Sequence, residues 1–328
     1  MKRSLAAVAS ASPSSSSKKS AIDVTKALRN QCASKTDSFE FQIGSTSDTY
    51  HVYSSDQPDD ERVISWFQSL NDSLPPKEVV AEESSPTSSL LLRGAIGLDC
   101  EWCPPWFRDN QPEHINNIQF YSPFTKNNDN NDFCLLLSVG NWEVSEIPPL
   151  LLALLADESI AKVGTNVTSD GSRLARDFDC TVAGLLNLEQ INKKGARVTM
   201  ELLCQSTCPK AFHIDKDAME SKVRLGNWAA WPLSEAQLKY ASMDAVISFA
   251  IFLFHSGGTW ATRCDLFPTT TTPLTTPLFV LESCQPLPPA EKNKLRSSPA
   301  SSGKNANFFL MHQNRSIILP NLNKKRTS

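Results

Sequence analysis

Two acids at the end of an apolar stretch are the first residues whose spacing suggests chemistry. In the sequence GAIGLDCEW, an extended strand directs Asp99 and Glu101 to one face and the larger apolar side chains to the other. Two like charges on one face repel each other unless a cation lies between them. A D-x-E triplet alone says little, because a second one, Asp59–Glu61, fits an ordinary polar helix start. The position of Asp99 and Glu101 after an apolar strand makes them candidate metal ligands.

A third acid, Asp170, lies in the stretch VGTNVTSDGSRLARDF. This stretch predicts a helix with a Thr or Ser cap, in which Asp170 stands one turn before Leu174 and two turns before Phe178. Acids are also favoured in a first helical turn by the free N–H groups and the helix dipole. Taken by itself, Asp170 therefore has an ordinary structural explanation.

The fourth acid, Asp244, lies inside the stretch LSEAQLKYASMDAVISFAIFLFH. As a helix this segment is apolar on almost every side, which predicts that it is buried. Asp244 stands one turn after Tyr240, and no lysine or arginine lies three or four residues away from it. A buried carboxylate without a partner costs several kcal/mol, so Asp244 must pair with a distant arginine, accept hydrogen bonds in the core, or bind a metal.

A single site for divalent cations accounts for all of these acids. Carboxylate oxygens are the ligands that Mg²⁺ and Mn²⁺ prefer. A pair of such ions generates a hydroxide at neutral pH and stabilises the attacking and leaving oxygens of a phosphodiester. Bound cations also reverse the local field of an acidic site, so that it accepts an acidic substrate.

The elements that must position these acids follow a regular pattern between residues 38 and 257. Strands come first and then alternate with helices, which predicts an α/β domain with a mixed sheet. The expected strands cover 39–44, 49–55, 94–102, 116–122, 132–140 and 160–166, and the expected helices cover 59–70, 147–159, 168–178, 184–222 and 233–255.

The charge is distributed unevenly along the chain. The formal net charge of the 328 residues is −3. Residues 1–22 carry +4, residues 286–328 carry +7, and the segment between them therefore carries −14. A domain that bound polyanions through surface charge alone would not be acidic.

The segments 1–37 and 258–328 are rich in Ser, Pro, Thr and Lys, and we expect both to be mostly disordered. The longest unbroken apolar run, LLLALLA, is too short to span a bilayer, so we expect no membrane partner. Nine cysteines at irregular spacing indicate reduced intracellular thiols.

Three segments together resemble a known family. The stretches GLDCEW, KVGTNVTSDGSRLARDF and LSEAQLKYASMDA resemble, in order and spacing, the three motifs of the DEDD 3′–5′ exonucleases. Tyr240, which precedes the last aspartate of its motif by one helical turn, places the resemblance in the tyrosine subgroup with RNase D and the Werner-type exonuclease domain. The stretches NIQF and RLGNWAAWPLSEAQLKYASMDA resemble that domain as well. The motif-bearing core covers residues 90–255.

The resemblance implies a ribonuclease H-like fold, a pair of Mg²⁺ or Mn²⁺ ions and hydrolysis of DNA or RNA from the 3′ end, with release of nucleoside 5′-monophosphates. It also implies that the metal ligands are Asp99, Glu101, Asp170 and Asp244, and that Tyr240 orients the attacking water. Tyr240 is a poor base because an unperturbed tyrosine stays protonated at neutral pH. The alternative is a catalytically silent nucleic-acid-binding adaptor that keeps the fold. The motifs do not distinguish DNA from RNA.

Other features stay open on the sequence alone. Cys100 and Cys103, or Cys204 and Cys208 with His213, would be zinc ligands in a second interpretation, although their spacing is not that of a zinc finger. The basic ends indicate a nuclear location, and the alternatives are an organellar transit peptide or the cytoplasm. Because no helicase segment is seen, unwinding would come from a helicase or another nucleic-acid-processing partner.

Overall fold

The description rests on a computed structural model of the chain. It covers residues 38–76, 90–108, 111–126, 132–191, 198–214, 221–258, 279–286 and 315–318, all of which belong to the unit Asp37–Ser328. The predicted N-terminal segment 1–37 and most of the predicted C-terminal tail lie outside these residues.

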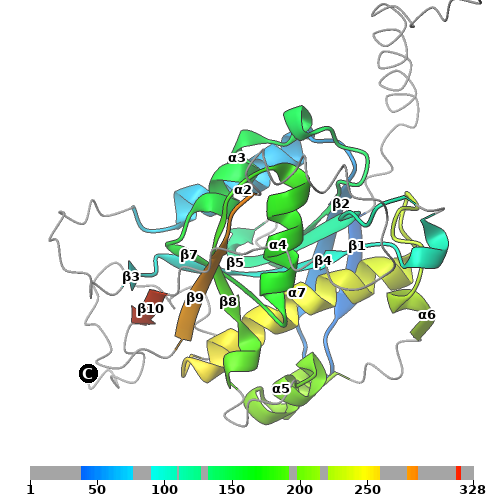
Figure 1. Cartoon of the computed structure of the whole chain (residues 1–328). Helices are drawn as coiled ribbons and strands as arrows, with labels where there is room; N and C mark the ends of the chain where they lie inside the picture. Colours follow the sequence, from blue (N-terminus) through cyan, green and yellow to red (C-terminus); the bar gives the residue numbers. More distant parts are fainter. Residues whose placement is uncertain are drawn as a thin grey trace, which may run out of the picture. The chain divides into compact units, whose positions relative to one another are not determined.

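A mixed β-sheet forms the frame of the fold (Figure 1). The pairs β1–β2, β4–β5, β5–β6 and β8–β9 are antiparallel, whereas β2–β6, β4–β7 and β7–β8 are parallel. The strand order is β1-β2-β6-β5-β4-β7-β8-β9-β10-β3. The strands are β1 (Ser38–Gln42), β2 (Thr49–Ser55), β3 (Leu90–Leu91), β4 (Gly94–Glu101), β5 (Asn117–Lys126), β6 (Asp132–Ser138), β7 (Ile160–Gly164), β8 (Val182–Asn187), β9 (Phe279–Cys284) and β10 (Arg315–Ile318). The prediction of an α/β domain with a mixed sheet is confirmed.

Helices cover both faces of this sheet. The helices are α2 (Glu61–Ser73), α3 (Pro149–Ala156), α4 (Val167–Phe178), α5 (Met200–Thr207), α6 (Ser221–Arg224) and α7 (Glu235–His255), with short 3₁₀ turns η1 (Pro105–Phe107), η2 (Val144–Glu146), η3 (Leu188–Ile191) and η4 (Lys210–Phe212). Buried side chains of α5 and α7 form one hydrophobic cluster with the sheet, and those of α2, α3 and α4 form the other. The central strand β4 contributes Ala95 to the first cluster and Ile96, Leu98 and Cys100 to the second, as its alternation predicts.

Helix α7 begins at a capping box and runs through the core. The Gln237 N–H donates to Ser234 Oγ at 3.3 Å, and the Ser234 N–H donates to Gln237 Oε1 at 3.2 Å, so two otherwise free N–H groups are satisfied. Of the helices that the structure describes, α7 alone is long and apolar enough to cross a membrane, but 83% of that stretch is buried inside the domain. Its apolar surface is thus explained by packing in a protein core.

A glycine allows α7 to approach the central strand. A Cβ atom at Gly97 of β4 would lie 1.9 Å from the carbonyl oxygen of Ala245, so only glycine permits this contact between two backbones. Ala245 follows Asp244, and Gly97 is two residues before Asp99 on the same face. The close approach therefore sets the distance between the acids of the strand and the acid of the helix.

We expect Gly97→Ala to lower the free energy of unfolding by about 3 kcal/mol, because strand and helix must separate to admit the methyl group. Urea denaturation measures this change. The matched control is Gly94→Ala on the same strand, where the added methyl would meet the flexible Leu74 side chain, which can give way. Equal stability of the two variants would contradict the role assigned to Gly97.

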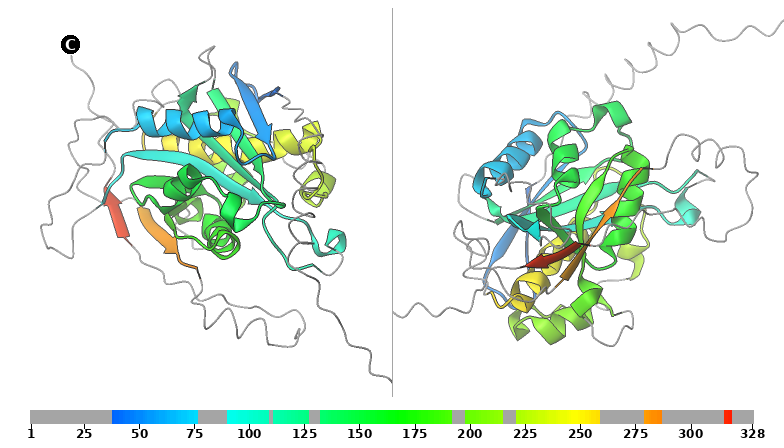
Figure 2. Two further views of the ribbon diagram at one scale, coloured as in Figure 1. Left: turned by 90° about the horizontal axis from the view of Figure 1, so that it is seen from above. Right: turned by 60° about the vertical axis from the view of Figure 1, so that its left-hand side comes forward.

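Three local predictions from the sequence are wrong. The helical stretch predicted for 184–222 begins instead with the strand β8, because a short apolar run such as VAGLLN has no periodicity that separates strand from helix. Helix α4 has no Thr or Ser cap; its N-cap is Asn166 with φ 56°, a left-handed conformation that asparagine tolerates. The sheet also continues past residue 257, since β9 pairs with β8 and is seen beside it in Figure 2.

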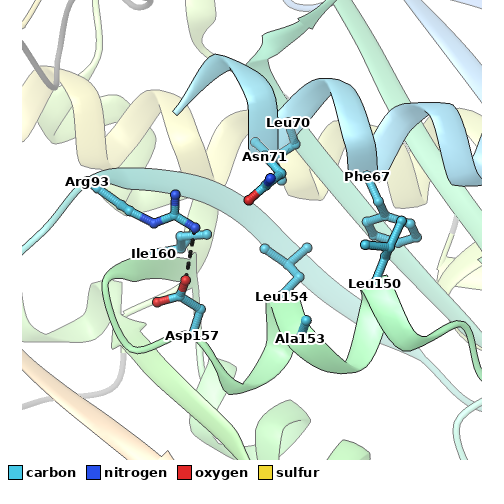
Figure 3. Close-up of a pocket in the computed structure, with 9 residues that line it drawn as sticks. All are labelled: Phe67, Leu70, Asn71, Arg93, Leu150, Ala153, Leu154, Asp157 and Ile160. Carbon is cyan, nitrogen blue, oxygen red and sulfur yellow. Dashed lines mark hydrogen bonds and ion pairs between the residues drawn. The ribbon is translucent and has the colours of Figure 1, made fainter. Parts of the chain in front are cut away.

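A half-buried ion pair joins the start of β4 to the end of α3 (Figure 3). Arg93 Nη2 donates to Asp157 Oδ2 at 2.9 Å, beside a pocket of about 90 Å³ between α2 and α3. Asp157 Oδ1 also accepts from the N–H of Ser159 at 3.0 Å and from its hydroxyl at 2.6 Å. Burial alone raises the pKa of Asp157, but the bonds from Ser159 and Arg93 outweigh it and lower the pKa below its usual 3.8.

We expect Asp157→Asn to lower the free energy of unfolding by about 2 kcal/mol at neutral pH, because charge-assisted hydrogen bonds are lost. Since the pKa of the folded state is depressed, this stabilisation is present above pH 3.8 and is lost as the pH falls through the lower pKa of the folded state. Urea denaturation at neutral and acidic pH measures both effects, with the exposed Asp72→Asn as control. A difference that persists unchanged in acid would show that the charge is not its cause.

Candidate active site

The end of β4 places the first two acids on the face that carries α7. In the β4–β5 ladder Asp99 pairs with Gln119 and Glu101 pairs with Asn117. Gln119 is fully buried, and its Nε2 donates to Asp99 Oδ2 at 2.9 Å. A cross-strand amide therefore fixes the orientation of the Asp99 carboxylate.

Three of the four predicted acids converge. Asp99, Glu101 and Asp244 each offer a carboxylate oxygen, and these oxygens lie within 4.8 Å of one another. Glu101 and Asp244 are buried, and Asp99 is partly exposed. Carboxylate oxygens bind divalent cations at about 2.0–2.6 Å, so two ligands of one ion lie up to roughly twice that distance apart. The spacing and chemistry of this group fit a hard divalent cation.

Asp170 approaches the acid group from α4 and is not part of the cluster of three. It is only 3% exposed. Burial raises the pKa of its carboxyl well above the usual 3.8, and the negative charge of Asp99 raises it further, whereas Arg173 opposes the shift. Asp170 and Asp99 therefore lie within electrostatic range of each other. Arg173 is itself held by Glu113, with Nε and Oε1 2.9 Å apart, and its guanidinium lies 3.9 Å from the centre of the Trp102 ring.

Tyr240 lies one turn before Asp244 on α7 and is 7% exposed. Burial raises the pKa of its phenol far above the usual 10, and the charges of Asp244, Glu101 and Asp99 add to this, while Arg224 lowers it. The hydroxyl therefore stays protonated throughout the neutral and moderately alkaline range. A protonated hydroxyl can orient a water molecule by a hydrogen bond.

Asp99, Glu101, Tyr240 and Asp244 line a cleft of about 960 Å³. Of the charged residues that the structure places along it, four are acids and one is a base: Asp99, Glu101, Glu201, Asp244 and Arg224. A cleft with this charge repels a polyanion unless cations are bound in it. The large volume is compatible with a polymer end, because sites for drug-sized ligands span about 300–1,000 Å³.

The cysteines considered as zinc ligands are engaged elsewhere. Cys100 is buried in the hydrophobic cluster on the opposite face of the sheet. The Cys204 thiol donates to the Phe212 carbonyl at 3.2 Å, and His213 Nε2 lies 3.1 Å from the Cys208 carbonyl oxygen. Within the described ranges, the three acids are the one group of His, Cys, Asp and Glu residues close enough to share an ion.

Two residues of the site were not singled out as functional from the sequence. Gln119 stands in the stretch NIQF, and only the register of β4 against β5 shows that it faces Asp99. Glu201 lines the cleft from the first turn of α5, where an acid is also a common helix-start residue. The stretch NIQF resembles the family, but nothing in it indicates a role for Gln119, and Glu201 does not differ from an ordinary acid at a helix start.

Comparison with known proteins relates this chain to 3′–5′ exonucleases. A model of the 3′–5′ exonuclease family matches residues 87–254, just over half of the chain. Human exonuclease 3′-5′ domain-containing protein 2 is 31% identical over 167 residues, which cover 48% of this chain and 24% of that protein. The mouse bifunctional 3′-5′ exonuclease/ATP-dependent helicase WRN is 27% identical over 161 residues, which cover 48% of this chain and 10% of that protein. RNase D of Trypanosoma brucei, solved in complex with RNA U12, is 18% identical, with a TM-score of 0.46 over 69% of this chain and 72% of that one.

The fold and the acid motifs define a ribonuclease H-like nuclease domain of the DEDD type. The chain belongs to the 3′–5′ exonuclease family, and the resemblance inferred from its motifs is confirmed. The match with the human and mouse relatives spans about a quarter of their length or less.

Proposed function

We propose that this protein hydrolyses the phosphodiester bonds of a polynucleotide from its 3′ end, with Mg²⁺ or Mn²⁺ as cofactor, and releases nucleoside 5′-monophosphates. The observation that carries this proposal is the convergence of Asp99, Glu101 and Asp244 at a cleft in a chain of the 3′–5′ exonuclease family. Three buried or partly buried carboxylates so close together destabilise the fold unless a cation offsets their repulsion.

Each residue of the site has a distinct part in the proposed reaction. Asp99, Glu101 and Asp244 would hold the metal ions, and Asp170, which approaches Asp99 from α4, would complete the ligand set. Two divalent ions, when bound, supply a hydroxide and stabilise the negative charge on the departing 3′ oxygen.

The remaining groups position the reactants. Tyr240, protonated beside Asp244, would orient the attacking water with its hydroxyl. Gln119 keeps the Asp99 carboxylate from rotating, since its Nε2 holds one of the two oxygens. Such hydrogen bonds to a ligand commonly change metal affinity or activity by about 10–100-fold when they are removed.

Single-stranded oligonucleotides labelled at the 5′ or the 3′ end test this proposal in the presence of Mg²⁺ or Mn²⁺. A 3′–5′ exonuclease converts the 5′-labelled strand into a ladder of shorter products and releases the 3′ label at once as a mononucleotide. DNA and RNA strands of the same sequence, run side by side, decide which polymer is preferred. Binding of both strands without any shortening would favour the alternative, a silent adaptor with the same fold.

We also propose a partner enzyme and a cellular location for this protein. The WRN relative carries a helicase activity in its name, and we infer that a helicase or another processing enzyme presents unwound ends to this chain. Most of the basic residues from which a nuclear location is inferred lie outside the described residues. The N-terminal segment that would instead be an organellar transit peptide also lies outside them.

A further inference from the structure

A tryptophan at the rim of the cleft has the most exposed large apolar side chain in the part of the chain that the structure describes. Trp106 is 63% exposed and lines the cleft, and Leu225, 41% exposed, lines it as well. The neighbouring Phe107 is 44% exposed but does not line the cleft. Exposed apolar groups around a cleft commonly mark a surface that binds a ligand.

The backbone around Trp106 is restricted by two prolines and by hydrogen bonds to a segment that is distant in the sequence. Trp106 lies in the 3₁₀ turn η1, and the two residues before it, Pro104 and Pro105, restrict the backbone. The Cys103 thiol donates to Asn227 Oδ1 at 3.1 Å, and the Ala229 N–H donates to Cys103 Sγ at 3.1 Å. The turn that follows β4 is thus joined to the segment that follows α6. A rigid aromatic group loses little conformational freedom when a ligand binds to it.

A positively charged residue lies next to Leu225 in the chain. Arg224 ends α6, precedes Leu225 in the chain and lines the cleft. Asp99, Glu101 and Asp244 line the same cleft, so a positive charge and the acids lie along one surface. An aromatic ring and a cation along one cleft are the combination with which proteins bind single-stranded nucleic acid, because every base has a face for stacking and every nucleotide a phosphate.

We propose that Trp106 stacks on a nucleobase close to the 3′ end while Arg224 contacts the adjoining backbone, so that the cleft selects unpaired ends. This inference rests on the proposed nuclease function. In a duplex the faces of internal bases are covered by their neighbours, and a paired end must fray before Trp106 can reach one. A recessed or blunt duplex is therefore a poorer substrate than a single strand of the same sequence.

A double-mutant cycle between protein and substrate tests the stacking. The protein variants are Trp106→Ala, Trp106→Phe and, as the matched control, Phe107→Ala. The substrates are a single-stranded oligonucleotide and the same strand with tetrahydrofuran abasic analogues in place of the nucleotides near its 3′ end. We expect Trp106→Ala to lower kcat/KM about tenfold on the base-containing strand, mainly through KM, because a stacked base contributes roughly 1–3 kcal/mol.

The same substitution should have no effect on the abasic strand, because the interaction is already absent there. Trp106→Phe keeps an aromatic face and should restore most of the loss, and Phe107→Ala should match the wild type on both strands. An equal loss on both strands, or no loss on either, would overturn the stacking role of Trp106.

Binding separates this inference from the proposed activity. Fluorescence anisotropy with the same labelled strands in Ca²⁺ reports affinity without requiring cleavage. If the wild type shortens neither strand but Trp106→Ala weakens binding only of the base-containing strand, the nuclease proposal fails and the stacking site stands. If the wild type shortens the strand but the affinities of the two proteins are equal, the stacking site fails and the nuclease stands.

Discussion

Replacement of Asp244 by asparagine should reduce turnover at least about 10³-fold, a loss of about 4 kcal/mol of transition-state stabilisation. Asparagine has nearly the same shape but replaces an anionic oxygen with a neutral amide. Asp244 belongs with Asp99 and Glu101 to the group of acids that we propose as metal ligands, and metal ions contribute several kcal/mol to the stabilisation of charge in phosphodiester hydrolysis. The loss of one ligand charge is therefore expected to appear in kcat, measured with a 5′-labelled strand at saturating Mn²⁺.

The stability of this variant distinguishes a metal ligand from an ordinary core residue. In a chelator, Asp244→Asn should be at least as stable as the wild type, because one of three crowded negative charges is removed. Added Mn²⁺ should raise the melting temperature of the wild type and have little effect on the variant, since a ligand stabilises only the state that binds it. The control is Glu235→Gln, an exposed acid at the start of the same helix. A variant that melts well below the wild type in chelator would indicate that Asp244 has a structural role instead.

Replacement of Tyr240 by phenylalanine should lower kcat about 10²-fold and leave KM nearly unchanged. The ring fills the same space between α7 and its neighbours, so only the hydroxyl is lost. Burial raises the pKa of Tyr240, and even an unperturbed phenol stays protonated at neutral pH, so we expect the hydroxyl to act as a hydrogen-bonding group and not as a base. We therefore expect the pH–rate profiles of the wild type and the variant to have inflections at the same pH values, with a lower rate for the variant at every pH.

Tyr53→Phe is the matched control, because its hydroxyl donates to Asp60 away from the cleft. Full turnover of Tyr240→Phe, with Asp244→Asn inactive, would show that Tyr240 does not orient the water. A basic inflection that disappears in the variant would show that its hydroxyl ionises during the reaction.

The α/β fold and the acids of the candidate site can be predicted from the sequence, because acids are unusual in strongly apolar segments. The strand containing Asp99 and the helix containing Asp244 are strongly apolar segments, and an acid in such a segment stands out against its surroundings. The same pattern predicts that these two acids and Glu101 share a single site, and the structure brings them together. Asp170 is less sharply defined, because an acid in a first helical turn has a structural explanation that does not require a metal.

What the sequence could not supply is information about distances between elements. The contact of Gly97 with Ala245 depends on two backbones far apart in the chain, and a glycine in a strand can equally mark a bulge or a bend. The bond from Gln119 to Asp99 depends on the register of β5 against β4, which the sequence of either strand leaves open. Strand β8 is the unbroken apolar run VAGLLN, which does not separate a strand from a helix, and β9 follows a stretch rich in Thr and Pro that predicts disorder. Trp106 lies in a turn after β4, and the sequence does not predict where an aromatic side chain in a turn points.

Anomalous diffraction from crystals soaked in Mn²⁺ locates the metal ions themselves. We expect a manganese peak in contact with the carboxylates of Asp99, Glu101 and Asp244, and a second contact to the ions from Asp170. A crystal with manganese bound only at other sites, or with these carboxylates free of metal at saturating Mn²⁺, would contradict this expectation.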